Sequence, residues 1–118
     1  MQLPYENTAL NFAHFLIQQH FTDAFALLSP ALQNSLSVAE LEKTYTKMVS
    51  YFKTPPNNAE LIEALSDWPG KLSDDVAWVY VSIDNGNTDA EAVSVTLESS
   101  NANAENQVTI RSIEWGRA

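Results

Sequence analysis

The chain has 118 residues, 45% of them hydrophobic, with no cysteine and a formal net charge of −9 at pH 7. This composition is typical of one globular domain that buries a core of its own, and the lack of cysteine excludes disulfide scaffolds and thiolate metal sites. The acidic excess argues against nucleic acid or anionic membrane partners, because binding to either depends on lysine and arginine side chains.

The first part of the chain is predicted to be helical. Apolar residues between positions 8 and 20 fall within one broad arc, which predicts a largely buried first helix. Thr22-Asp23 is a candidate N-cap for a short second helix that runs to Leu28 and is ended by Ser29-Pro30. A single helical turn is expected to follow over residues 31–34.

The third predicted helix has the clearest pattern. Ser37 and Glu40 are spaced as in a capping box, in which each side chain bonds the backbone amide of the other residue. Apolar side chains from Val38 to Phe52 then recur at helical spacing. Pro55-Pro56 ends the helical half, which we place at residues 1–54.

The second half, residues 59–118, is predicted to form an antiparallel sheet within the same single domain. Residues 76–83 are rich in β-branched and aromatic side chains, 84–87 give a turn signal, and apolar and polar residues alternate over 93–97. A polar loop over 99–106 leads to the last strand.

Two segments of this half need further interpretation. The apolar spacing of 60–68 fits a short helix, but its position before 76–83 favours a strand paired with that segment. In the strand over 108–115, Val108 and Ile110 have even numbers while Ile113 and Trp115 have odd ones. A β-bulge near Arg111-Ser112 would place all four on one face.

Three helices followed by about four antiparallel strands resemble the nuclear transport factor 2-like group, also described as cystatin-like. The residues that carry the resemblance run from Asn11-Phe12 to Leu28-Ser29-Pro30, from Leu36-Ser37 to Phe52, and through the strands to Ile113-Glu114-Trp115-Gly116. The resemblance implies an α+β fold, a cone in which a curved sheet wraps the first helix. This fold serves isomerases, dehydratases, small-ligand binders, dimerisation modules and immunity proteins, so it constrains function poorly.

The sequence contains no diagnostic catalytic motif. His14 and His20, six residues apart on a helix, point about 120° away from each other, so no metal site is expected, and no cofactor motif is present. Isomerases of the group resembled use a pocket carboxylate and a tyrosine, but no acidic residue here is forced inward by its neighbours. His14, Tyr45 and Trp68 remain candidates for lining a pocket, and Asp67 is the candidate acid.

Acidic and aromatic residues gather in the second half, where eleven of the fifteen acidic residues follow Ala59. Trp78 and Tyr80 share one face of their strand and emerge opposite the helices if Ala77 and Val79 face them; otherwise they point into the cone. Large aromatic side chains surrounded by charge of one sign can anchor and steer an oppositely charged partner. The candidate partner-binding residues are Asp67, Asp74, Asp75, Trp78, Tyr80, Asp84, Asp89 and Glu91.

These observations lead to three functional hypotheses. The first is a non-enzymatic, acidic binding protein that masks a basic protein partner, such as an immunity protein that inhibits a toxin, for example a nuclease. The second is a pocket protein of the same fold, either a small-ligand binder or an isomerase- or dehydratase-like enzyme. The third is a homodimer built through the Trp78 face. No basic, apolar leader pattern is visible at the start, so a cytoplasmic location is expected.

Overall fold

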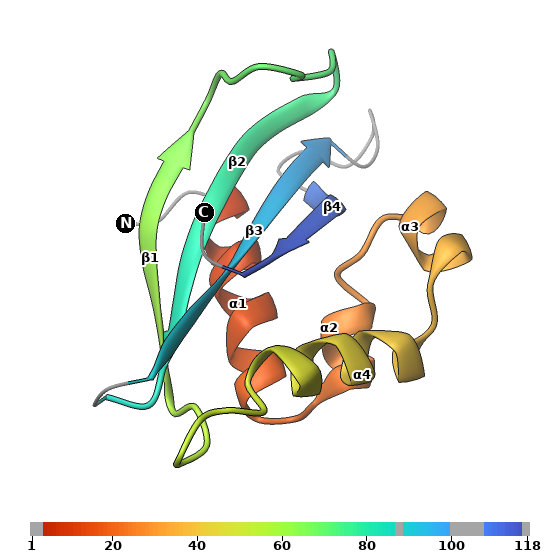
Figure 1. The fold of residues 1–118 in the computed structure, drawn as a ribbon. Coiled ribbons are helices and arrows are strands. Elements are labelled where there is room, and N and C mark those ends of the chain that lie inside the picture. Colours follow the sequence, from red (N-terminus) through yellow and green to blue (C-terminus); the bar gives the residue numbers. More distant parts are fainter. Residues whose placement is uncertain (1–3, 87–88, 100–107, 117–118) are drawn as a thin grey trace.

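The computed structural model describes residues 4–86, 89–99 and 108–116. Within these ranges the helices are α1 (Pro4–Ile17), α2 (Phe21–Phe25), α3 (Pro30–Ser35) and α4 (Val38–Met48), and the strands are β1 (Asn58–Leu65), β2 (Asp75–Asp84), β3 (Ala90–Ser99) and β4 (Val108–Trp115). The strands form one antiparallel sheet in the order β1-β2-β3-β4. Figure 1 shows α1 crossing behind the strands, with α2 and α4 beside it. The α+β class is therefore confirmed.

The prediction of three helices is wrong, because the turn expected over 31–34 is a helix of its own. Ser29 is its N-cap and accepts a hydrogen bond from the Leu32 amide at 3.2 Å, while Pro30 occupies the first turn, where its missing N–H costs nothing. The predicted Thr22-Asp23 cap is also wrong. α2 already begins at Phe21, and its N-cap residue, His20, makes no side-chain capping bond.

The capping box that starts α4 is confirmed. The Ser37 hydroxyl accepts a bond from the Glu40 amide at 3.1 Å, and the Glu40 carboxylate accepts one from the Ser37 amide at 2.9 Å. Leu41 and Tyr45 from the predicted apolar stripe are buried. The helix ends at Met48 rather than Phe52, and the Ser50 hydroxyl donates a bond to the Lys47 carbonyl at 2.9 Å just beyond this end.

The strand alternative for 60–68 is confirmed for residues 60–65, which belong to β1 and pair with β2, whereas residues 66–68 follow the end of the strand. The bulge in β4 is confirmed as well: Ser112 lies opposite Thr96 and Ile110 lies opposite Leu97, which leaves Arg111 as the extra residue. The turn predicted over 84–87 extends into residues that lie outside the described ranges, and so does most of the loop predicted over 99–106.

The hydrophobic core lies between one face of the sheet and the helices. Ala77, Val79, Val81 and Ile83, which alternate along β2, are fully buried and belong to one cluster with residues of α1 such as Phe12 and Leu16. The intervening β2 residues are half-buried on the opposite face. Of the two orientations left open by the sequence, the structure thus has Trp78 and Tyr80 on the face that points away from the core.

Candidate functional site

Trp78 and Tyr80 form a stacked aromatic pair on the face of the sheet opposite the helices, which we call the Trp78 face. Because side chains alternate along a strand, these two residues project on the same side, with ring centroids 6.0 Å apart and an interplanar angle of 27°. Both rings are half-buried. The pair is therefore an apolar surface with a fixed orientation that still contacts solvent.

A contact across β3 helps to position this pair. The indole Nε1 of Trp78 on β2 lies 3.5 Å from the Glu114 Oε1 on β4, and β3 runs between these two strands. The register places Thr96 opposite Trp78, and Ser94 opposite both Tyr80 and Glu114. Ser94 and Thr96 are only 5% and 7% exposed. We conclude that the large side chains on either side of β3 cover its small ones.

Acidic side chains flank the aromatic pair on both sides, from β1 and from β4. Glu63 of β1 lies opposite Tyr80, and Glu60 lies opposite Ser82, which is the next residue of β2 on the same face. On the other side, Glu114 of β4 approaches Trp78. A shallow cleft of about 230 Å³ is lined by Ile62, Glu63, Trp78 and Tyr80. Ile62 is 53% exposed, so an apolar side chain and a carboxylate border the aromatic rings directly.

The acidic residues singled out in the sequence lie at the two ends of the sheet and not in one ring. Asp67 and Asp74 are exposed in the segment between β1 and β2, whereas Asp84, Asp89 and Glu91 lie at the opposite end, around the β2–β3 hairpin. A strand as long as β2 spans roughly 30 Å at about 3.3 Å per residue. The two groups therefore cannot form one compact patch.

The hairpin acids make structural hydrogen bonds. Asp84 accepts a bond from the Gly86 amide at 2.8 Å, which stabilises a turn in which Gly86 has a φ of +77°. Asp89 accepts a bond from the Lys53 amide at 2.8 Å, and Glu91 accepts one from the Tyr51 hydroxyl at 2.8 Å. These bonds attach the hairpin to the segment that follows α4.

Asp75 is buried and serves as an internal partner of Arg111. Its two carboxylate oxygens accept bonds from Arg111 Nε at 2.7 Å and Nη2 at 2.8 Å, and the Leu72 amide donates a further bond at 2.8 Å. The hydrogen bond from Arg111 is the main reason that the pKa of Asp75 lies below its usual value. Its charge is thus compensated within the protein, so Asp75 does not belong to the acidic surface.

Sequence reasoning missed the contribution of Glu60, Glu63 and Glu114 to the Trp78 face. Glu60 and Glu63 belong to the segment whose secondary structure was ambiguous, and Glu114 is remote from Trp78 along the chain. Their proximity depends on strand register, which contains a bulge in both β1 and β4. Alternation of Glu114 with Ile113 and Trp115 was the one available signal that its side chain faces away from the core.

The three candidate pocket residues do not come together. Tyr45 is buried and lines a cavity of about 500 Å³ between the end of α1, α2, α4 and the segment after α4. His14 is exposed on α1, and Trp68 is half-buried between β1 and β2, with the Lys71 amine 5.7 Å from its ring centroid. Burial raises the pKa of Tyr45 to about 12.

Among the described residues no group of three metal-ligating side chains could hold an ion. Helices in these ranges are too short or too polar to span a membrane. Comparisons of the chain with protein-family models, with curated proteins and with solved structures give no significant match.

Proposed function

We propose that this protein binds a basic protein partner with the Trp78 face and does so without catalysing a reaction. The observation that carries the proposal is the stacked Trp78–Tyr80 pair on a sheet face that has glutamates on both flanks. Aromatic side chains are the commonest energetic anchors of protein interfaces, since they bury a large area at little cost in conformational entropy.

The charge around the anchor supports a basic partner. Glu60 and Glu63 lie on one side and Glu114 on the other, while Arg111 is already paired with Asp75. Asp67 and Asp74 extend the negative charge beyond one end of the sheet. An acidic surface of this kind accelerates association with a basic partner and makes the rate depend on salt.

The partner class that best fits this chemistry is a basic toxin domain, for example a nuclease whose active site binds phosphates. An immunity protein of this type would cover that site, and the likeness to the nuclear transport factor 2-like group, with its cone-shaped fold, is part of the same proposal. Such a protein would act in the cytoplasm, where a toxin of this class meets nucleic acid.

The proposal can be tested by capturing partners on the immobilised protein from its native cell extract at low salt and eluting with salt. A released protein counts as a partner if it is basic and, once purified, binds the chain one to one. We expect Trp78→Ala to weaken this binding by at least about 30-fold, as for an interface hot spot. A thermal melt of the variant verifies that it is folded.

A pair of charge reversals provides the matched control. Glu63→Lys on the Trp78 face and Glu42→Lys on α4 both replace an exposed glutamate and change the net charge equally. We expect Glu63→Lys to slow association and reduce its salt dependence far more than Glu42→Lys. The proposal fails if the two variants behave alike, or if no basic protein is retained.

A further inference from the structure

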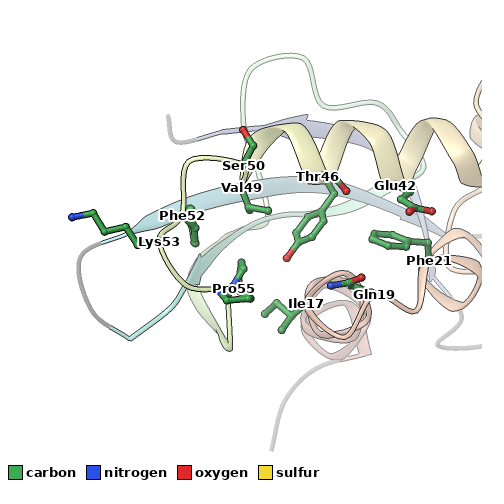
Figure 2. A pocket seen from close by; sticks show the side chains of 12 residues that line it. Ile17, Gln19, Phe21, Glu42, Thr46, Val49, Ser50, Phe52, Lys53 and Pro55 are labelled. Carbon is green, nitrogen blue, oxygen red and sulfur yellow. The ribbon is translucent and has the colours of Figure 1, made fainter.

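A second feature, separate from the Trp78 face, is the cavity lined by Tyr45. Figure 2 shows Ile17 and Gln19 on one side of it and Thr46 and Val49 on the other. Phe21, Phe52 and the two prolines of Pro55-Pro56 provide most of the remaining wall. Its volume of about 500 Å³ lies within the range of pockets that enclose small organic ligands.

The Tyr45 hydroxyl is a polar group that lies beside the apolar part of this lining and has no hydrogen-bond partner among the described residues. Tyr45 is 4% exposed, and its hydroxyl makes no hydrogen bond to any described residue. Among the described residues, Thr109 Oγ1 is the one side-chain oxygen that is both sealed from solvent and without a hydrogen-bond partner. The Tyr45 oxygen also has no partner among these residues, so it is not sealed from solvent. The Tyr45 oxygen must therefore open onto the cavity. With a pKa of about 12, the hydroxyl stays protonated at neutral pH and can donate a hydrogen bond.

Two observations indicate that a molecule bound in this cavity would be uncharged. Glu42 and Lys53 both line the cavity, but Figure 2 shows Lys53 extending away from the other lining side chains. An anion would thus find no inward-pointing cation in a protein whose net charge is −9. A cation would reach only the exposed Glu42 and would lose its hydration against apolar walls.

Backbone strain lies beside the same cavity. Gln19 has a φ of +62°, and it is the single non-glycine residue with a positive φ in the described ranges. This left-handed conformation ends α1, because the backbone amides of residues 19 and 20 bond the carbonyls of its last turn. The position also places an amide side chain, which can both donate and accept hydrogen bonds, next to the cavity.

We infer that this cavity is a binding site for a small, neutral, largely apolar molecule that carries a hydrogen-bond acceptor such as a carbonyl group. The aromatic or aliphatic part of the ligand would contact Ile17, Phe21 and Val49, and its carbonyl oxygen would accept a hydrogen bond from Tyr45. This site does not depend on the proposed protein partner.

Acetophenone, an aromatic ketone, is a suitable probe, and the backbone amide signals of Phe21, Thr46 and Val49 in NMR spectra report on the cavity. We expect saturable shifts of these signals in the wild-type protein. Tyr45→Phe, which keeps the ring and removes the hydroxyl, should weaken binding roughly 2- to 10-fold, the usual effect of losing one neutral hydrogen bond. Val49→Phe should fill the cavity and abolish the shifts.

Tyr80→Phe is the matched control, because it removes a tyrosine hydroxyl on the opposite face of the sheet, outside the cavity lining. It should bind acetophenone as the wild type does. Benzoate and benzylammonium, charged molecules of similar size, should bind at least about tenfold more weakly, because each loses its hydration on entering an apolar site. The inference is overturned if acetophenone shifts none of these amides, binds Tyr45→Phe unchanged, or binds no better than the charged probes.

Discussion

At the level of single residues, the Asp75–Arg111 ion pair joins β2 to the bulge of β4. Since β3 lies between β2 and β4, the pair reaches across β3, as the Trp78–Glu114 contact does. The Asp75 side chain is fully buried, whereas that of Arg111 is 30% exposed. A buried carboxylate is tolerated because the guanidinium binds both of its oxygens.

Removing the arginine should therefore destabilise the protein in a pH-dependent way. Arg111→Leu leaves the Asp75 carboxylate buried without its cation, and we expect a loss of about 3 kcal/mol in the free energy of unfolding at neutral pH. The folded state lowers the pKa of Asp75, so the pair contributes stability above the ordinary aspartate pKa of about 3.9, and this contribution is lost as the pH falls below it.

Urea unfolding of the wild type and Arg111→Leu at neutral and at strongly acidic pH measures this effect. The difference between the two proteins should shrink as the pH is lowered. Asp75→Asn with Arg111→Leu serves as the reference, since neither charge remains. A difference that is the same at both pH values would show that Arg111 stabilises the fold by packing and not through its charge.

At the level of elements, the end of α1 is unusual in its residue type. The backbone N–H of Gln19 donates a hydrogen bond to the Leu16 carbonyl at 3.0 Å, and the backbone N–H of His20 donates one to the Phe15 carbonyl at 2.8 Å. This is the pattern of a Schellman motif. The Phe15 and His20 rings stack with centroids 6.5 Å apart, as the apolar contact of that motif. Glutamine occupies the left-handed position where glycine is usual.

Gln19→Gly is accordingly expected to stabilise the fold, by roughly 1 kcal/mol, because glycine adopts a positive φ without strain. Gln18→Gly is the control, since residue 18 has no positive φ to relieve, and it should give no gain. The urea concentrations at the unfolding midpoints of Gln19→Gly and Gln18→Gly, each compared with the wild type, distinguish these outcomes. If Gln19→Gly is no more stable than Gln18→Gly, the strain at this position is negligible.

The elements that sequence analysis predicted correctly are those with a strong local signal. The capping box at Ser37 and the parity change in β4 each specify one geometry from a few neighbouring residues. Ser29-Pro30 was interpreted only as a helix end, although the same pair starts α3, because a stop and a start look alike over so short a distance.

The candidate site was harder to predict than the elements, because it depends on contacts between remote segments. The alternation that places Trp78 and Tyr80 on one face is local. Which strand residues lie opposite them depends on register and on two bulges, so Glu63 and Glu114 were not selected. Asp75 was interpreted as one more surface acid, because no residue near it in the sequence indicates its contact with Arg111.

At the scale of the whole molecule, the charges differ between the two halves of the chain. Lys43 and Lys47 are exposed on α4, on the helical side, whereas the strands carry Glu60, Glu63 and Glu114. The Trp78 face is therefore a negative surface on a protein that is itself negative. Such a surface favours a partner of opposite charge and disfavours a second copy of the chain.

This charge leads to a prediction about the oligomeric state. In a twofold dimer built through the Trp78 face, the same patch of both copies would meet, which brings the glutamates of one copy towards those of the other. Like-charge repulsion is strongest when little salt screens it, so we expect a monomer at low ionic strength in sedimentation velocity experiments. A dimer at low salt that Trp78→Ala dissociates would instead show that the face is a homodimer interface and would refute the masking of a basic partner.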